Sequence, residues 1–339
     1  MDAIQSDVLI IGAGVSGLSC ARALMARGAT VQVLDRAKSP GGRCASRTLE
    51  EGGPIFDFGP VFLHGEDPQF LDIIQNLPQS RPQTWPKVLK GHGTPCQPNA
   101  FEGPQKRYRL QWGVKDLPLN LAEGVHLKLN TKIVNLRWEK DHFLAVDEAG
   151  GIYKGRNLVL ALALEQAQSL LGGLTPPLHQ GKGAWGLLKE FSSLPSLTLL
   201  ASYSDSDPDQ NWDIWYPEDS KAILLMARQG AEGLNLVLQA KASWSAERLK
   251  KAPHDWSEEL LQEAALLLGD WVLTPRLSKT HTWKHGRLNP SQHLKGPLSL
   301  KIPGTRCSLN LVGDLFDPAG GVEGAWRSGT KMGETLEWK

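Results

Sequence analysis

The sequence predicts a mixed α/β protein of two domains, and three stretches of the chain support this prediction. The first is a strand–helix–strand unit over residues 8–35. The second is a run of strands over residues 126–164, and the third is a set of apolar stretches over residues 196–242 that predicts a separate antiparallel sheet. With 339 residues and 41% apolar side chains, the chain is long enough to bury two cores.

The N-terminal unit begins with a buried strand at residues 8–11, and Gly12-Ala-Gly14-Val-Ser-Gly17 follows it at once. A helical pattern then runs to Gly28, and a second strand covers residues 30–34. In such a turn the first glycine permits the sharp bend. The second lets backbone approach a pyrophosphate, and the third lets helix and strand pack closely. The unit therefore predicts a Rossmann-type site in which a helix N-terminus meets phosphates.

Asp35 directly follows the second strand. At that position a carboxylate can accept hydrogen bonds from both ribose hydroxyls of a dinucleotide, and it repels the additional phosphate of an NADP-type ligand. Both NAD and FAD use this kind of unit, so the residues after Asp35 decide between them.

The remaining elements are predicted from apolar spacing and turn residues. A helix is expected over residues 257–268, with Ser257 as its N-cap and Gly269 as its stop. Residues 308–312 predict a strand, and a helix is expected from about Val322 toward Leu336. Breaks are expected in the Pro-rich stretch between residues 77 and 104, at residues 175–177 and at the acidic loop of residues 205–209.

Composition excludes several classes of protein. Lys plus Arg total 37 against 36 for Asp plus Glu, which leaves no broad charge that would favour nucleic acid or an anionic membrane. The four cysteines are scattered, so they predict neither a metal site nor a disulfide framework, and a reducing, cytoplasmic setting is expected. They are Cys20, Cys44, Cys96 and Cys307. No apolar run is long enough to span a bilayer.

Residues 35–43, Asp35-Arg-Ala-Lys-Ser-Pro-Gly-Gly42-Arg43, resemble the stretch that follows the second strand in FAD enzymes of the amine oxidase superfamily. In that family the paired glycines let the loop pass close to the cofactor, and the arginine meets its pyrophosphate. Residues 57–62 continue the likeness, with Gly59 and Pro60 matching a turn beside the flavin. The resemblance implies that Phe62 and His64 line the active site.

The C-terminal stretch from Leu311 to Gly329 resembles the second signature of the same superfamily. The resemblance implies that Asp314 bonds the ribityl chain or the pyrophosphate, and that the amides of residues 321–323 face the flavin ring. The helix that follows would direct its positive end at the ring, which favours the negative charge of the reduced flavin. Together these segments assign the cofactor to Gly12, Gly14, Val15, Ser16, Gly17, Asp35, Arg36, Gly42, Arg43, Gly59, Pro60, Val134, Gly313, Asp314, Gly321, Val322 and Glu323.

The series of residues 243–249, the helix at Ser257, and His281-Thr-Trp283 looks like the one seen in renalase and its bacterial relatives. In those proteins the matching tryptophan lies by the substrate face of the flavin, so the resemblance places Trp283 there. The chain departs from that family at Lys284-His285-Gly286, at Gly321 and at Cys44-Ala45. These departures put the identity of the substrate in doubt but leave the FAD frame intact.

The resemblance implies an FAD-dependent oxidase that takes hydride from NAD(P)H isomers reduced at the wrong ring carbon and passes electrons to dioxygen. A flavin amine oxidase is the main alternative, with Trp215 and Trp283 as aromatic walls. Desaturases or isomerases of the superfamily with apolar substrates, and a binding module with a structural flavin, remain further alternatives. The candidates on the substrate side are Trp283, His64, Phe62, His285 and Trp215.

The predicted architecture is a discontinuous Rossmann-type FAD-binding domain and a smaller α+β substrate domain. Residues 1–75, 111–165 and 275–339 are assigned to the FAD-binding domain, and residues 76–110 and 166–274 to the substrate domain. The expected partners are FAD, a small-molecule substrate and dioxygen.

Overall fold

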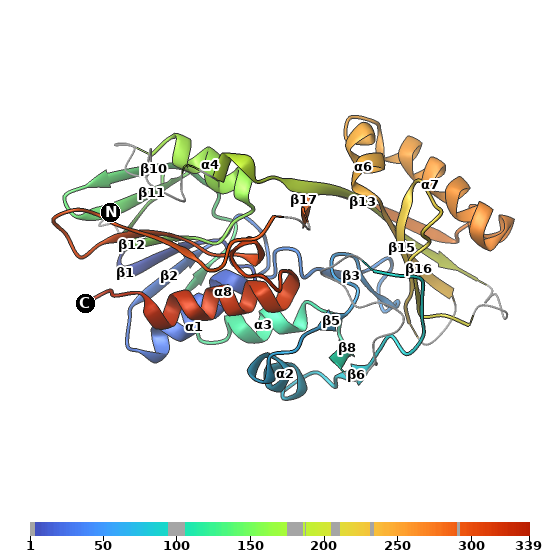
Figure 1. Ribbon diagram of the computed structural model, residues 1–339, viewed down its shortest axis with the longest axis horizontal. Coiled ribbons are helices and arrows are strands. Elements are labelled where there is room, and N and C mark those ends of the chain that lie inside the picture. Colours follow the sequence, from blue (N-terminus) through green and yellow to red (C-terminus); the bar gives the residue numbers. More distant parts are fainter. Residues whose placement is uncertain are drawn as a thin grey trace. The chain divides into compact units, whose positions relative to one another are not determined.

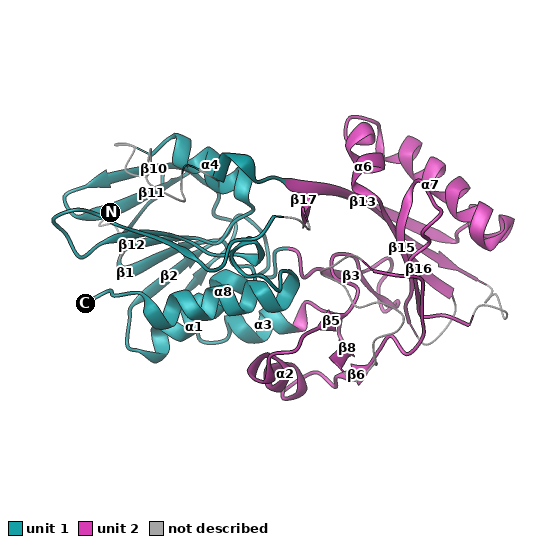
Figure 2. Cartoon of the chain, viewed as in Figure 1, with its two compact units in different colours: residues 1–42, 117–192, 291–339 teal, residues 43–116, 193–290 magenta. Residues whose placement is uncertain are grey.

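The computed structural model describes residues 4–93, 106–174, 186, 188–204, 211–230, 234–289 and 292–339. The chain divides into two compact units, coloured separately in Figure 2. Unit 1 comprises residues 1–42, 117–192 and 291–339, and unit 2 comprises residues 43–116 and 193–290.

Unit 1 is an α/β unit built on one eight-stranded sheet (Figure 1). Its strands are β1 (Ile4–Ile11), β2 (Val31–Leu34), β9 (Leu127–Lys128), β10 (Ile133–Glu139), β11 (His142–Asp147), β12 (Ile152–Leu160), β18 (Leu298–Lys301) and β19 (Ser308–Leu311). Its helices are α1 (Val15–Ala26), α3 (Asp116–Ala122), α4 (Leu164–Gly172) and α8 (Gly321–Thr335). The predicted strand–helix–strand unit and the predicted C-terminal strand and helix are confirmed. Their ends lie within one residue or so of the prediction, except that β1 begins four residues earlier.

Four parallel strands of unit 1 end in one row. Ile11 of β1 is registered with Leu34 of β2 and with Leu160 of β12, and Leu160 is registered with Leu311 of β19. The residues that follow these strands therefore share one edge of the sheet. Carboxyl edges of parallel strands are where α/β proteins bind ligands.

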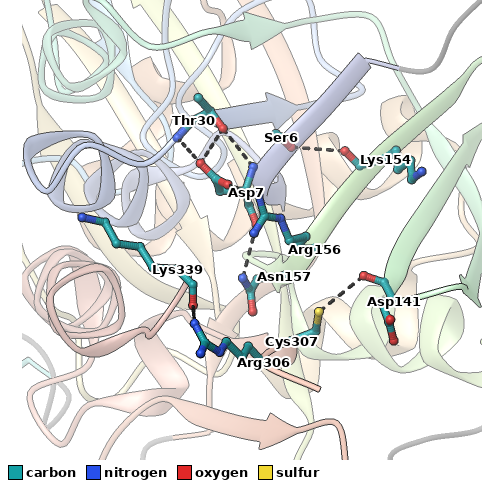
Figure 3. Close-up of polar contacts among 10 residues, drawn as sticks. All are labelled: Ser6, Asp7, Thr30, Asp141, Lys154, Arg156, Asn157, Arg306, Cys307 and Lys339. Atoms are coloured by element: carbon teal, nitrogen blue, oxygen red, sulfur yellow. Dashed lines mark hydrogen bonds and ion pairs between the residues drawn. The ribbon is translucent and has the colours of Figure 1, made fainter. Parts of the chain in front are cut away.

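Polar contacts farther back along the strands, where β2 and β19 begin, hold this register (Figure 3). Asp7 Oδ2 accepts hydrogen bonds from the Thr30 amide and hydroxyl at 2.9 and 2.6 Å, and Arg156 pairs with Asp7 at 3.2 Å. Asn157 donates to the Asp7 carbonyl at 3.2 Å and accepts from the Ser308 amide at 2.8 Å. One network thus ties together β1, β12 and β19 and the residue that precedes β2. A slip of one residue would break these bonds.

Helices α1 and α8 lie side by side in unit 1 (Figure 1), and glycines set how closely they approach. A Cβ added at Gly329 would run into the carbonyl oxygen of Ser16, and one added at Gly333 would lie 2.7 Å from the carbonyl oxygen of Cys20. Such backbone-to-backbone contact is open only to glycine. Gly329 and Gly333 meet Ser16 and Cys20, so the two helices run parallel. Because Ser16 is the second residue of α1 and Gly329 the ninth of α8, α8 begins about 10 Å before α1 along their common direction.

Unit 2 is built on a six-stranded sheet in the order β17-β13-β16-β15-β14-β7. Its strands are β3 (Ser46–Thr48), β4 (Ile55–Asp57), β5 (Leu63–His64), β6 (Gln83–Thr84), β7 (Leu89–Lys90), β8 (Arg107–Arg109), β13 (Ser193–Tyr203), β14 (Ile214–Trp215), β15 (Ile223–Arg228), β16 (Leu234–Ala240) and β17 (Leu277–Leu288). Its helices are α2 (Pro68–Gln75), α6 (Ala242–Arg248) and α7 (Pro253–Leu268). The antiparallel pairing of β15 with β16 confirms the sheet predicted from residues 196–242.

The two faces of this sheet bury different apolar clusters. One face packs against α6 and α7 through a cluster that we call the helix-side core, which includes Trp244, Trp256 and Leu260. The other face packs against the segment of residues 56–62 through a cluster that we call the aromatic-side core, which includes Phe58, Phe62, Trp85 and, at its margin, Trp283. The alternation of side chains along β13 and β16 separates the two cores.

Helix α7 begins earlier than predicted. The helix expected from Ser257 starts instead at Pro253, with Ala252 as N-cap, so Ser257 lies inside α7 and its hydroxyl donates to the His254 carbonyl. Proline is favoured in the first helical turn, and this outweighed the serine as a start signal. Gly269, with φ of 94°, ends the helix as predicted. The breaks expected at residues 175–177 and 205–209 lie outside the described residues.

The unit boundaries differ from the predicted domain boundaries at four segments. Residues 43–75, 111–116 and 275–290 belong to unit 2, and residues 166–192 belong to unit 1. The first and third of these follow from packing, because the 56–62 segment lies on the sheet of unit 2 and β17 pairs with β13 along most of its length. Cys20, Cys44 and Cys307 are buried free thiols, while Cys96 lies outside the described residues. In the described part of the chain, no helix combines the length and the apolar character needed to cross a membrane.

The contact between α1 and α8 can be tested with one substitution. Gly329→Ala should lower the free energy of unfolding by about 1–3 kcal/mol, because overpacking against backbone cannot be relieved by a rotamer change. The control is Gly172→Ala, at the end of α4, where an added Cβ meets nothing within 4 Å and alanine gains helix propensity. Chemical denaturation of both variants would measure the difference. Equal stabilities would show that the two helices are free to separate.

Candidate functional site

Of the three glycines in the turn between β1 and α1, two have no room for a side chain and one does. A Cβ at Gly12 would collide with the Ala161 carbonyl, and one at Gly17 would collide with the Gly12 carbonyl. A Cβ at Gly14 would meet nothing within 4 Å. Gly12 and Gly17 are therefore required by the fold itself, whereas the space beside Gly14 is available to a ligand.

Both helices at this edge begin without a side-chain cap. Gly14 is the N-cap of α1 and Gly320 is the N-cap of α8, so neither N-cap residue has a side chain that could bond the first amides of its helix. The first amides of each helix, those of residues 15–17 and 321–323, point out of the helix without an intrahelical acceptor. With the positive end of each helix dipole added, unit 1 presents two electropositive donor sites. The offset of about 10 Å along the helix direction suits one long ligand with two acceptor regions.

The Gly41-Gly42 loop lies against this turn. The Gly41 amide donates to the Ala13 carbonyl at 2.9 Å, and a Cβ at Gly42, whose φ is 57°, would lie 3.4 Å from the Gly14 Cα. Asp35 also supports the turn, because its carboxylate accepts from the Ala13 amide at 2.6 Å and from the Ala37 amide at 2.7 Å. Each carboxylate oxygen retains a second lone pair, so a ribose contact remains open to Asp35.

The second signature is held to the first by direct contacts. Ser328 Oγ accepts from the Gly313 amide at 3.2 Å, in the helix whose Gly329 packs on Ser16. Asp314 is buried at 8% exposure at the start of a short 3₁₀ turn. Beyond it, Arg327 pairs with Asp317 at 3.2 Å and lies 3.7 Å from Glu323, so the buried Glu323 carboxylate is held by a residue of its own helix.

Three other predicted cofactor residues, Arg36, Arg43 and Val134, lie outside the two glycine-rich turns. Arg36 is exposed after β2, and Arg43 is the first residue assigned to unit 2. Val134 is 48% exposed near the start of β10. Thr131, three residues before Val134, donates from its amide to the Asp35 carbonyl at 2.8 Å. The roles of these residues stay predictions.

In unit 2 the backbone of residues 57–59 is held by three side chains from the sheet. Gln229 bonds both the amide and the carbonyl of Asp57, at 2.7 and 3.1 Å. Gln239 donates to the Gly59 carbonyl at 2.6 Å, and Trp283 Nε1 donates to the Phe58 carbonyl at 3.0 Å. A Cβ at Gly59 would collide with the Arg43 carbonyl, so glycine is required at this turn. The turn is therefore rigid, as a binding surface needs to be.

The Trp283 ring belongs to a cluster of four side chains. Phe58 stacks on Trp283 with centroids 5.6 Å apart, His281 lies edge-on to Trp283 at 4.1 Å, and the Arg47 guanidinium lies 4.1 Å from the Phe58 ring centre. Arg47 Nη2 is 3.5 Å from His281 Nδ1, and since arginine only donates, Nδ1 is the acceptor nitrogen. Burial and the charge of Arg47 lower the pKa of His281 from 6.5 to about 4. The imidazole is therefore neutral at physiological pH.

The residues that follow Trp283 form a bulge. Ser196 is registered with Trp283 and Leu194 with Arg287, so residues 284–286 of β17 face one residue of β13. Lys284, His285 and Gly286, one of the three stretches that depart from the renalase pattern, form this bulge. A Cβ at Gly286 would come within 2.9 Å of the Trp283 Cβ, so the glycine lets the tryptophan pack closely.

The structure brings together some of the predicted substrate-side residues and separates others. Phe62 belongs to the aromatic-side core with Trp283, and its ring lies edge-on to Trp85 at 6.4 Å. His64 lies on β5, where it is registered with Arg107 of β8. Trp215 packs with Trp212 on the helix-side core, across the sheet from Trp283. The expectation that Trp215 and Trp283 form facing aromatic walls is therefore not supported, because the two rings lie on opposite faces of the sheet.

The sequence interpretation missed Arg47, His281 and Gln239. His281 is two residues before Trp283 on the same strand, so the period of two was the available signal for it. Arg47 lies on β3, registered with Phe56 of β4, and no local pattern links it to Trp283. Gln239 reaches Gly59 from 180 residues away. Only tertiary pairing reveals such contacts.

Comparisons with known proteins agree with this geometry at the N-terminus. The family model of the NAD(P)-binding Rossmann-like domain matches residues 10–77. Putrescine oxidase of Kocuria rosea is 36% identical over 75 residues, which are 22% of this chain and 15% of that protein. UDP-N-acetylmuramoylalanine--D-glutamate ligase of Frankia casuarinae is 50% identical over 75 residues, which are 22% of this chain and 16% of that protein. Each match spans less than a fifth of the relative, and the two relatives have different activities.

A likeness over the whole chain comes from solved structures. A double mutant of putrescine oxidase, redesigned in its cofactor binding, superposes with a TM-score of 0.74 at 12% identity and covers 99% of both chains. The predicted fold class is thus confirmed: a mixed α/β fold with a Rossmann-like NAD(P)-binding domain. These matches do not single out the renalase type.

Asp57, the first residue of the rigid turn at residues 57–59, is a buried acid that makes the stability of the fold depend on pH. Its side chain accepts from Ser46 Oγ at 2.5 Å and from the Val114 amide at 2.8 Å. Burial raises the pKa of Asp57 from 3.8 to about 7, although these hydrogen bonds oppose the rise. Between these two values the unfolded chain is ionised while the folded protein still holds its proton. Stability from this group is therefore complete below about pH 4 and is lost as pH rises through about 7.

Asp57→Asn removes this titration and keeps an acceptor for Ser46 and Val114. Relative to the variant, the wild type should lose up to about 4 kcal/mol of unfolding free energy between about pH 4 and about pH 8, at 1.36 kcal/mol per pKa unit. Urea denaturation across that range measures it. Asp219→Asn, an exposed position in the same unit, is the control and should keep the wild-type pH dependence. Parallel curves for wild type and Asp57→Asn would contradict the assignment.

Proposed function

Because the chain has the fold of the FAD/NAD(P)-binding amine oxidase-type superfamily, we propose that unit 1 binds FAD and that the protein is an FAD-dependent oxidase. Its proposed donors are small reduced molecules, above all NAD(P)H isomers reduced at the wrong nicotinamide carbon, as the resemblance to renalase implies. When bound, the flavin would accept a hydride from the donor and pass two electrons to dioxygen, which yields hydrogen peroxide.

One observation carries the cofactor proposal: two uncapped helix N-termini at one edge of the sheet, next to the open space at Gly14. The amides of residues 15–17 would hold the pyrophosphate and Asp35 the ribose. Asp314 would hold the ribityl chain or the pyrophosphate. The amides of residues 321–323 would face the polar edge of the flavin ring, where negative charge develops on reduction. A mononucleotide would leave one of the two donor sites unused.

Residues of unit 2 are proposed to contact the donor. Trp283 is fixed by its hydrogen bond to the Phe58 carbonyl and by stacking on Phe58, so its ring offers a rigid flat surface for a planar substrate ring. His281 is neutral at physiological pH, so it would not protonate a bound donor. A hydride transfer needs orientation and exclusion of water more than proton transfer, so the protein requires no acid–base pair.

An amine oxidase is the second candidate, and the fold likeness to putrescine oxidase supports it. A neutral amine steered between two aromatic rings would need a second wall beside Trp283. Trp215 does not provide that wall, since it packs in the helix-side core. Phe58 stacks on Trp283 with the ring centroids 5.6 Å apart, which leaves no space for an amine between these two rings, so the nicotinamide isomers remain the leading donors.

The cofactor proposal is tested by Gly14→Ala. An added methyl at Gly14 meets no protein atom within 4 Å, so the apoprotein should fold with stability within about 1 kcal/mol of wild type. The methyl would stand where a pyrophosphate approaches, so FAD affinity should fall by about 10-fold or more, which is a loss of about 1.4 kcal/mol or more. Flavin titration measures the affinity, and thermal unfolding of apoprotein measures the stability. Unchanged FAD affinity would contradict this placement of the pyrophosphate.

The reaction is tested by mixing the yellow holoprotein anaerobically with a panel of donors: ordinary NADH, its ring isomers, amines and an apolar polyene. The ring isomers should bleach the flavin fastest, and oxygen should then restore the colour with one peroxide per donor. Trp283→Leu should slow bleaching by about 10-fold or more through lost orientation.

The donor that bleaches the flavin fastest identifies the reaction. Rapid bleaching by ordinary NADH alone would replace the proposal with a reductase, and rapid bleaching by amines alone would replace it with an amine oxidase. Gly172→Ala, far from both glycine signatures in sequence, is the control and should match the wild-type rates.

A further inference from the structure

Two guanidinium groups near Trp283 lack a carboxylate partner among the described residues. Arg47 lies over Phe58 and beside His281, and Arg287 follows the bulge after Trp283. Within the part of unit 2 that the structure describes, no Asp or Glu oxygen lies within 4.0 Å of either side chain's nitrogens. Glu50, the acid nearest to Arg47 in sequence, is engaged by Arg276. Positive charge in this cluster is therefore not neutralised by any described carboxylate.

Arg287 is the more constrained of the two. One of its terminal nitrogens donates to Gln239 Oε1, the residue that holds the Gly59 carbonyl. Its Nε atom is buried and has no hydrogen-bond partner among the described residues. A buried donor left unsatisfied costs about 1–3 kcal/mol, so a group that accepts from it would be favoured. Burial also lowers the pKa of Arg287 to about 10, which still leaves it charged at neutral pH.

Two buried hydroxyls on the Trp283 face of the sheet also have no hydrogen-bond partner among the described residues. Ser196 is registered with Trp283 and Thr198 with His281, and paired residues of an antiparallel sheet share a face. The oxygens Ser196 Oγ and Thr198 Oγ1 are buried and have no hydrogen-bond partner in the described part of the chain. The cluster thus combines two cations and two unsatisfied hydroxyls around flat aromatic rings.

We propose that this cluster, which comprises Arg47, Arg287, Ser196 and Thr198 around Trp283, binds a phosphate or pyrophosphate group of an aromatic substrate. Guanidinium groups pair with phosphate oxygens through charge-assisted hydrogen bonds. Because the cluster offers the N–H groups of two guanidinium groups and two hydroxyls, a ligand with several acceptor oxygens suits it best. The proposal rests on the proposed function, because Trp283 is there assigned to the donor. It narrows the donor to an anionic ring compound such as a nicotinamide nucleotide.

The same charges act against the alternative donor. A protonated amine would bring a third positive charge to a cluster that holds two and offers no carboxylate among its described residues. A neutral His281 adds no compensating negative charge. An anionic donor instead neutralises the cluster, so the charges favour it over an amine that arrives protonated.

The test is calorimetric titration of FAD-saturated holoprotein with inorganic pyrophosphate at low ionic strength. Saturation with FAD excludes binding at the cofactor's own pyrophosphate site. Wild type should bind one equivalent, Arg47→Gln should bind at least about 10-fold more weakly, and Arg47→Lys should recover part of the loss. Arg228→Gln is the control, because Arg228 also lies over an aromatic ring, Trp212, but that ring belongs to the helix-side core. It should bind like wild type.

Three results would overturn the proposal: no saturable binding by wild type, equal binding by Arg47→Gln and wild type, or loss of FAD affinity in Arg47→Gln. The last would assign the guanidinium to the cofactor. The donor panel is an independent arm. Arg47-dependent pyrophosphate binding without bleaching by any NADH isomer would refute the proposed reaction alone. Bleaching by ring isomers with a KM unchanged in both Arg47→Gln and Arg287→Lys would refute the anion site alone.

Discussion

Close packing of α1 on α8 is the constraint on which the geometry of unit 1 depends. Gly329 stands directly on the Ser16 backbone, and Gly333 stands on the next turn of α1, so the two helices have one relative position. The row of strand ends then fixes where each helix begins. Two uncapped N-termini about 10 Å apart along the helix direction follow from this packing. An ordinary helix pair with larger side chains would separate by several ångströms and lose that spacing.

Sequence reasoning succeeded where one residue has one physical reason to be present. Gly12 and Gly17 have no room for a side chain, and Gly14 has room that a ligand can use, which is the division of roles expected from the spacing alone. It was wrong at Ser257, where two start signals competed within five residues and Pro253 prevailed. It also paired Trp215 with Trp283, because composition shows how many aromatic residues exist but not which face of a sheet each one occupies.

The remaining site residues could not be read from the sequence because their partners lie far along the chain. Gln239 and Gln229 look like ordinary strand glutamines, yet they hold the backbone of residues 57–59 from more than 170 residues away. Arg47 and Arg287 look like surface cations in a chain whose charges balance overall. Their lack of carboxylate partners among the described residues is a property of the folded cluster. A net charge of +1 therefore conceals a local concentration of positive charge.

Support for Trp283 shows how a buried polar network can serve an aromatic surface. The Phe58 carbonyl accepts from Trp283 Nε1, the Gly59 carbonyl accepts from Gln239, and Gln239 in turn accepts from Arg287. Each residue in this series of hydrogen bonds fixes the next one, so the Trp283 ring is positioned by hydrogen bonds as well as by stacking. Arg287 then has two tasks: its terminal nitrogen holds Gln239, while its Nε atom has no acceptor among the described residues. A substitution there would therefore disturb both the hydrogen bonds that support Trp283 and the proposed anion site, whereas Arg47 makes none of those hydrogen bonds. That difference makes Arg47 the more informative position for deciding which substrate the cluster accepts.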